Sequence, residues 1–216
     1  AACGAGSFAL PEQSVAVSTT GPRGGCASAQ AATSREAPCL TPEQSRVEEL
    51  VREGRNVFFT GSAGTGKSFT LNRVLAALKD RYGTDALYKE RVAVCATTGI
   101  AATHIGGVTL NSVAGFGQAS EWGHFGRMWA PAARRRWRAL EVLVLDEVSM
   151  LSAEALEILE CMARRIRGDS RPFGGVQLVF SGDFFQLPPV SRQPKPGVDS
   201  PDTFHNRGLA FPAPPG

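Results

Sequence analysis

The chain has 216 residues, of which 43% are hydrophobic and 20% charged, and its formal net charge is +3. That composition fits one soluble globular domain with a substantial core, and no apolar run approaches the ~20 residues that span a bilayer. The five cysteines form no CxxC pair and no cluster with histidine, which argues against a zinc site.

Composition divides the chain into three parts. Residues 1–39 are rich in Ala, Ser, Gly and Thr, and they predict a disordered leader. Residues 40–190 alternate helical and strand patterns and predict one folded domain. Residues 191–216 are rich in proline and predict a frayed, truncated end.

The expected elements follow one another as in a doubly wound α/β domain. Thr41, Pro42 and Gln44 form a T-P-x-Q capping box that starts a helix, and Gly54 ends it. Continuous apolar runs predict buried parallel strands, and a long apolar stripe predicts a helix over 153–167. The strands are expected over residues 56–60, 91–97, 142–145 and 176–180. Strand and helix alternation predicts a parallel sheet with helices on both faces.

The strongest local pattern is a phosphate-binding loop between the first expected strand and the next helix. It matches G-x-x-x-x-G-K-[ST] at every defined position, as Gly61-Ser62-Ala63-Gly64-Thr65-Gly66-Lys67-Ser68. Its glycines let backbone N–H groups turn toward phosphate oxygens, and the following helix directs its positive end at the same anion. Lys67 can reach the β- and γ-phosphates, and the Ser68 hydroxyl can bind Mg²⁺.

A second pattern is an apolar strand that ends in two acids, Asp146 and Glu147. Ligands of open α/β sheets collect at the carboxyl ends of the strands, where these acids are expected. Asp146 is the candidate Mg²⁺ ligand, and Glu147 is the candidate base that polarises the attacking water.

Further segments resemble the Pif-one (petite integration frequency) helicases of superfamily 1. The resemblance covers residues 40–190, and the quoted segments are LTPEQ at 40–44, ATTGIAA at 96–102, TLNSVAG at 109–115, DEVSML at 146–151, PFGG at 172–175 and FSGDFFQLPPV at 180–190. The family implies a P-loop NTPase of RecA-like fold that uses ATP and Mg²⁺ to move 5′-to-3′ along DNA.

The resemblance also implies roles for particular residues. Gln44 would read the adenine edge, although it can equally serve only as a helix cap. Gln186 would contact the γ-phosphate and act with Lys67 and Glu147 in turnover. Residues 96–103 and 109–117 would line a track for single-stranded DNA. Two basic runs have plainer readings, since arginines 134–136 with tryptophans suit a solvated helix with one buried Trp, and residues 164–167 suit a solvated helix end.

The family's second RecA-like domain is not found in this sequence, so a helicase fragment is expected. The alternative is a non-catalytic module that binds ATP or single-stranded DNA, and a different P-loop ATPase is disfavoured by the FFQLPPV and PFGG segments. Expected partners are single-stranded DNA and DNA duplex junctions, with no membrane and a monomeric state. The resemblance places the protein in the nucleus or mitochondrion, in repair, recombination or telomere maintenance.

Overall fold

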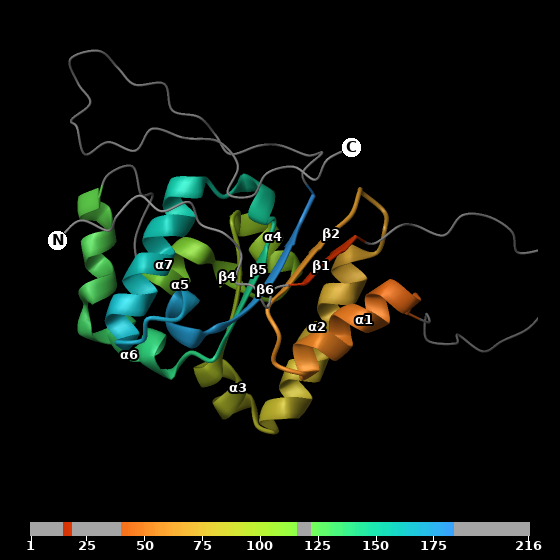
Figure 1. Cartoon of the computed structure of the whole chain (residues 1–216), viewed down its shortest axis with the longest axis horizontal. Helices are drawn as coiled ribbons and strands as arrows, with labels where there is room; N and C mark the ends of the chain where they lie inside the picture. Colours follow the sequence, from red (N-terminus) through yellow and green to blue (C-terminus); the bar gives the residue numbers. More distant parts are fainter. Residues whose placement is uncertain (1–14, 19–39, 116–121, 184–216) are drawn as a thin grey trace, which may run out of the picture.

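A computed structural model of the chain describes residues 15–18, 40–115 and 122–183 and shows a parallel sheet between two layers of helices (Figure 1). The six strands are β1 (Val15–Ser18), β2 (Val57–Thr60), β3 (Val92–Ala96), β4 (Val108–Thr109), β5 (Val142–Asp146) and β6 (Gln177–Gly182). Their order in the sheet is β1-β2-β6-β5-β3-β4, and every neighbouring pair is parallel. All strands therefore end at the same edge of the sheet.

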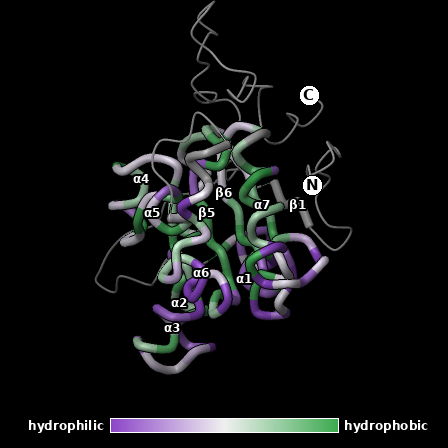
Figure 2. Tube along the Cα trace, turned by 90° about the vertical axis from the view of Figure 1, so that its left-hand side faces the viewer, coloured by the Kyte–Doolittle hydropathy of each residue, from purple (hydrophilic) through white to green (hydrophobic). Residues whose placement is uncertain are grey.

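Both faces of the sheet are buried, as the continuous apolar runs predict. On one face, Leu143 and Leu145 of β5 pack with α5 (Leu110–Ala114), α6 (Pro131–Ala139) and α7 (Ala153–Arg167). On the other, Val142 and Val144 pack with α1 (Pro42–Arg52), α2 (Lys67–Tyr82), α3 (Asp85–Arg91) and α4 (Gly99–His104). Figure 2 shows β5 and β6 as hydrophobic, while the outer turns of α1 and α6 are hydrophilic.

The four expected strands correspond to β2, β3, β5 and β6, with ends that agree within two residues. Two strands were not expected. β4 has only two residues, too few to give a pattern, and β1 lies inside the segment for which a disordered leader was expected. These four residues of β1 depart from that expectation because they add a parallel strand to the edge of β2. The rest of 1–39 and all of 191–216 lie outside the described residues.

The end of α7 was expected to be solvated, and this is wrong for Arg167. Its guanidinium donates to the carbonyls of Trp137 at 2.5 Å, Leu140 at 2.7 Å and Gly174 at 2.6 Å. Gly174 belongs to η3 (Pro172–Gly175), where Phe173 has φ 51° and Gly174 has φ 64°. A Cβ on Gly174 would lie 2.6 Å from Cδ of Arg167. The PFGG turn therefore brings its backbone up to this arginine, which joins α7 to the end of α6 and to η3.

The basic helix α6 fits the reading of a helix with one buried tryptophan, although its arginines are not simply solvated. Trp137 is fully buried. Arg136 donates to the carbonyl of Ser112 at 3.0 Å, and Arg138 donates to that of Ile166 at 3.2 Å. Arg134 lies over the ring of Trp129, with 5.7 Å to its centroid. These contacts fasten α6 to its neighbours through charge-assisted hydrogen bonds.

Among the described residues, the helices are too short or too polar to cross a lipid bilayer.

Candidate nucleotide site

The candidate site lies where β2, β5 and β6 end side by side. β2 leads into the loop 61–66, β5 ends at Asp146, and β6 is followed by Asp183. Two loop glycines need their conformational freedom, because Gly64 has φ 81° and Gly66 has φ 85°. The loop turns sharply into α2, so Lys67 and Ser68 form the first turn of that helix.

Lys67 faces the acids of the neighbouring strands while remaining tied to its own loop. Its Nζ donates to the carbonyl of Gly61 at 2.6 Å and to that of Ser62 at 3.1 Å. The same Nζ lies 3.5 Å from Oδ2 of Asp183, whose side chain is only 2% exposed. Both carbonyls belong to the loop that would hold phosphate, so a bound phosphate can replace them with little movement of the chain.

Gln44 combines a helix cap with a contact to the phosphate loop. Its Oε1 accepts from the Thr41 N–H at 3.1 Å, and the Thr41 hydroxyl accepts from the Gln44 N–H, which completes the expected capping box. Its Nε2 donates to the carbonyl of Thr65 at 3.2 Å. A Cβ on Gly66 would lie 2.7 Å from that nitrogen, so a glycine is needed there. Gln44 therefore sets the position of the phosphate loop, whether or not it also contacts the adenine of a nucleotide.

Asp146 has one carboxylate oxygen held in place. Its Oδ1 accepts from the Ser181 hydroxyl at 2.7 Å and from the Glu147 N–H at 2.9 Å. A carboxylate fixed through one oxygen can offer the other to a cation. Mg²⁺ in phosphoryl-transfer sites is held by one or two protein oxygens together with phosphates and water. Asp146 with the exposed hydroxyl of Ser68 supplies such a set of oxygen donors, so these residues fit Mg²⁺.

Glu147 has an unusual backbone and a perturbed carboxyl. Its φ of 54° is left-handed, which few residues other than glycine adopt. Partial burial raises the pKa of its carboxyl, and the neighbouring charge of Asp146 raises it further, whereas Lys67 lowers it and Asp183 raises it. The two sequence patterns meet through β6, because Lys67 lies 3.5 Å from Asp183 after that strand and Asp146 accepts from Ser181 within it. A raised pKa suits a group that must accept a proton.

The structure also brings to this site three residues that the sequence analysis did not place there. Ser181, Asp183 and Thr97 each contact Lys67, Asp146 or Glu147. Each is a polar residue at the carboxyl end of a predicted parallel strand, which is the signal that could have found them. Gln186 lies outside the described residues, so its predicted contact with the γ-phosphate stays a prediction.

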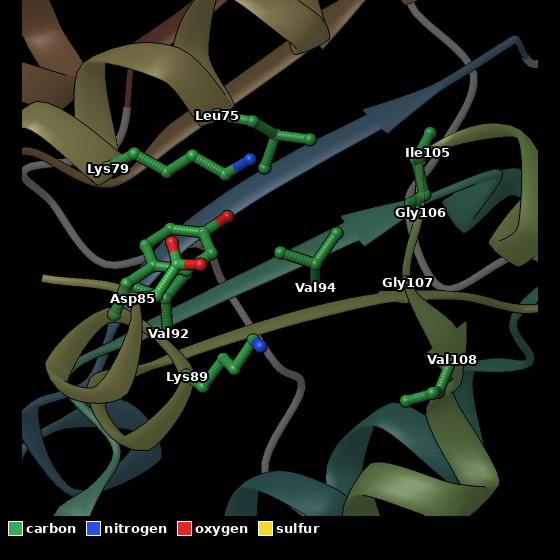
Figure 3. A pocket seen from close by; sticks show the side chains of 11 residues that line it. Leu75, Lys79, Asp85, Lys89, Val92, Val94, Ile105, Gly106, Gly107 and Val108 are labelled. Carbon is green, nitrogen blue, oxygen red and sulfur yellow. The ribbon is translucent and has the colours of Figure 1, made fainter.

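A cavity of about 330 Å³ lies elsewhere, along the outer side of β3 (Figure 3). Lys79 and Lys89 reach toward it from α2 and α3, and the connection Ile105–Val108 closes its far side. It contains none of the residues that carry the phosphate or metal chemistry. The candidate site is therefore an open strand edge rather than this cavity, as expected where a nucleotide lies on backbone N–H groups.

Comparison with known proteins agrees with this geometry. The sequence model of the family described as PIF1-like helicase matches residues 39–199, which is more than half of the chain. The chain belongs to this family. It is 48% identical over 161 residues to the ATP-dependent DNA helicase PIF1 of Saccharomyces cerevisiae, which covers 72% of this chain and 18% of that protein. The human ATP-dependent DNA helicase PIF1 is 44% identical over 161 residues, covering 74% of this chain and 24% of that protein.

Solved structures of PIF1 helicases share the fold. The Candida albicans Pif1 helicase aligns with a TM-score of 0.64 and 44% identity, over 71% of this chain and 34% of that one. The Bacteroides Pif1 helicase in complex with ADP-AlF3 and single-stranded DNA aligns with a TM-score of 0.61 and 31% identity, over 73% of this chain and 35% of that one. These matches confirm the RecA-like parallel sheet. This chain spans about a fifth of the length of the curated PIF1 relatives and a third of the solved chains.

Proposed function

We propose that this chain is the first ATPase domain of an ATP-dependent DNA helicase, in which ATP hydrolysis drives movement along single-stranded DNA and duplex unwinding. The observation that carries the proposal is that the phosphate-loop lysine lies 3.5 Å from Asp183 after β6, while Asp146 at the end of the neighbouring β5 is held by Ser181 of β6. Its PIF1 relatives are named ATP-dependent DNA helicases. The polarity proposed is 5′-to-3′, by resemblance to the Pif-one helicases.

Binding of the triphosphate begins at the loop. The backbone N–H groups of residues 61–66 and the start of α2 surround the phosphates, and Lys67 moves its amine from the Gly61 and Ser62 carbonyls to phosphate oxygens. Asp183 balances the lysine charge before the nucleotide arrives. Gln44 holds the loop through Thr65 and offers its second amide hydrogen to an adenine edge.

Hydrolysis uses the two acids at the end of β5. Ser68 and Asp146 would hold Mg²⁺, which neutralises developing phosphate charge when bound. Glu147 takes a proton from the attacking water, aided by the raised pKa of its carboxyl. Gln186 is proposed to contact the γ-phosphate. The segments 96–103 and 109–117 are proposed to line the DNA track, with hydroxyl and backbone N–H groups that contact phosphate without reading sequence.

The proposed partners are single-stranded DNA and DNA duplex junctions. One solved relative is the Bacteroides Pif1 bound to single-stranded DNA, and another concerns DNA unwinding at forked double-stranded DNA by two coordinating Pif1 helicases. We further propose that the protein acts as a monomer in the nucleus or mitochondrion, in repair, recombination or telomere maintenance.

An unwinding assay tests the proposal. A forked duplex with a 5′ single-stranded tail is expected to be opened by the complete protein, whereas a duplex with only a 3′ tail is not. Residues 1–216 assayed alone are expected to bind nucleotide weakly and hydrolyse it slowly without unwinding DNA. In the family, an arginine of the second RecA-like domain completes the ATP site, and such an arginine contributes about 10³–10⁵ in rate in related systems. Unwinding by residues 1–216 alone would contradict the proposal, and so would equal unwinding of the 5′-tailed and 3′-tailed duplexes by the complete protein.

The same preparation tests the second candidate, a non-catalytic module that binds ATP or single-stranded DNA. This module would bind Mg·ATP or DNA without turnover even in the complete protein. Hydrolysis that requires both Lys67 and Glu147 in the complete protein would exclude it.

A further inference from the structure

Thr97 connects the end of β3 to the backbone of the proposed catalytic acid. Its hydroxyl donates to the carbonyl of Glu147 at 3.0 Å, and its N–H donates to the carbonyl of Asp146 at 3.3 Å. The Glu147 N–H in turn donates to Oδ1 of Asp146. Each polar group of the Glu147 backbone is thus bonded to a side chain, the N–H to Asp146 and the carbonyl to Thr97.

The backbone of Glu147 needs such support. Its left-handed conformation, with φ 54° and ψ 40°, is disfavoured in any residue that carries a Cβ. The following turn, η2 (Val148–Met150), supplies one further bond, from the Met150 N–H to the same carbonyl at 3.0 Å. That bond lies within the turn, whereas the Thr97 hydroxyl ties the turn to a different strand.

The two adjacent threonines have different tasks. Thr98 is the N-cap of α4, because its hydroxyl accepts from the Ala101 N–H at 3.2 Å. Thr97 points the other way, to Glu147. The helix that Thr98 caps presents Ile100 at 76% exposure, so α4 has an open surface directly after the Thr97 contact. A displacement of α4 can therefore reach Glu147 through one residue, because Thr97 directly precedes the N-cap of α4 and its hydroxyl bonds to the Glu147 carbonyl.

From this geometry we propose that Thr97 is a positioning residue: its hydroxyl fixes the carboxylate of Glu147 for proton transfer and is the contact through which α4 acts on that carboxylate. The part that concerns catalysis rests on the function proposed above. A carbonyl freed from Thr97 lets the peptide plane rotate, and displacements near 1 Å at a reacting group lower rates by about a hundredfold.

Three variants separate this role from a general packing role. Thr97→Val keeps the shape and removes the hydroxyl, and Thr97→Ser keeps the hydroxyl. Thr84→Val is the matched control, because its hydroxyl accepts from the Leu87 N–H at 3.3 Å at the start of α3, outside the nucleotide site and the proposed DNA track. Each variant is measured for Mg·ATP affinity, for single-turnover ATP hydrolysis in the complete protein with and without single-stranded DNA, and for amide hydrogen exchange without nucleotide in residues 1–216.

Thr97→Val is expected to bind Mg·ATP within about twofold of wild type, yet to hydrolyse it at least about tenfold more slowly and to lose stimulation by DNA. Amides of residues 147–150 are expected to exchange faster in this variant alone. Thr97→Ser is expected to keep the wild-type hydrolysis, DNA stimulation and amide exchange, and Thr84→Val to leave all three unchanged.

The inference would be overturned if Thr97→Val hydrolysed ATP and exchanged its amides at the wild-type rates. It would also be overturned if Thr97→Ser were as impaired as Thr97→Val. The exchange measurement needs no nucleotide, so it decides whether Thr97 holds Glu147 even if the wild-type chain fails to bind Mg·ATP. That failure would refute the proposed function instead.

Discussion

Lys67 and Arg167 are two cations that donate to backbone carbonyls, but they do so in opposite ways. Lys67 bonds to carbonyls five and six residues before it, within one loop. Arg167 bonds to carbonyls of the α6 end, 27 to 30 residues before it, and to Gly174 in the PFGG turn after it. Glycine or left-handed residues let the backbone come close in both places.

The difference lies in what each cation can release. Lys67 can exchange local carbonyls for a phosphate without moving any strand, so its bonds are replaceable. Arg167 cannot leave without separating α7 from α6 and η3, and burial already lowers the pKa of its guanidinium. A cation held by nearby carbonyls of its own loop is thus suited to binding, whereas one held by distant segments is suited to structure.

The largest expected effect on stability follows from Arg167→Met. Removing the guanidinium leaves several carbonyls of the α6–α7 corner without their donor, and hydrogen bonds to charged groups contribute about 1.5–3 kcal/mol each. We expect the free energy of unfolding in urea to fall by about 3 kcal/mol. Arg135→Met, at an exposed position of α6, is the control and should change this free energy by less than about 0.5 kcal/mol. If Arg135→Met lost as much stability as Arg167→Met, Arg167 would not be a structural anchor, and its contrast with Lys67 would fail.

The largest expected effect on binding follows from Lys67→Ala. Mg·ATP affinity, measured by calorimetry, should fall about a hundredfold because the phosphates lose a charge-assisted donor. The free energy of unfolding should change by less than about 1 kcal/mol, since the lysine's carbonyl partners lie in its own loop. Lys79→Ala, later on the same helix, is the control and should bind as wild type does. If Lys67→Ala bound Mg·ATP normally, the candidate site would be wrong.

Glu147→Gln separates turnover from binding. Hydrolysis should fall by at least about 10²-fold, with Mg·ATP affinity unchanged. The amide should also stabilise the nucleotide-free chain at neutral pH, by less than about 1 kcal/mol because solvent screens a half-buried group. A raised folded pKa means that wild type gains stability as pH falls through that pKa, so the advantage of glutamine should shrink in acid. An advantage that grew in acid would contradict the direction of the shift.

The smallest expected effect concerns Gln44. Gln44→Ala should lower the free energy of unfolding by about 1 kcal/mol, since the capping box and the bond to Thr65 are lost. If Gln44 also reads adenine, the variant should lose preference for ATP over inorganic triphosphate, as competition binding would show. Unchanged preference would leave Gln44 as a cap and a loop support only.

Local patterns predicted much of the site because the chemistry lies in short segments. The loop 61–68 and the acids at 146–147 are contiguous, and each needs only its flanking strand to be recognised. The capping box at Thr41 and Gln44 is equally local, and the structure confirms it. The position of Ser181 and Thr97 at strand ends is visible in the sequence, but their partners are not, since those lie 35 and 50 residues away.

By itself the sequence determined the parallel sheet, the phosphate loop and the acidic strand end, because apolar periodicity and glycine placement act within a few residues. Its short motifs also sufficed to show the resemblance to the family. Only the tertiary structure decided that Arg167 is a structural anchor, that β1 and β4 extend the sheet, and that Thr97 supports Glu147. Those outcomes depend on hydrogen bonds between segments distant in the chain, and such bonds leave no periodic signal in the sequence.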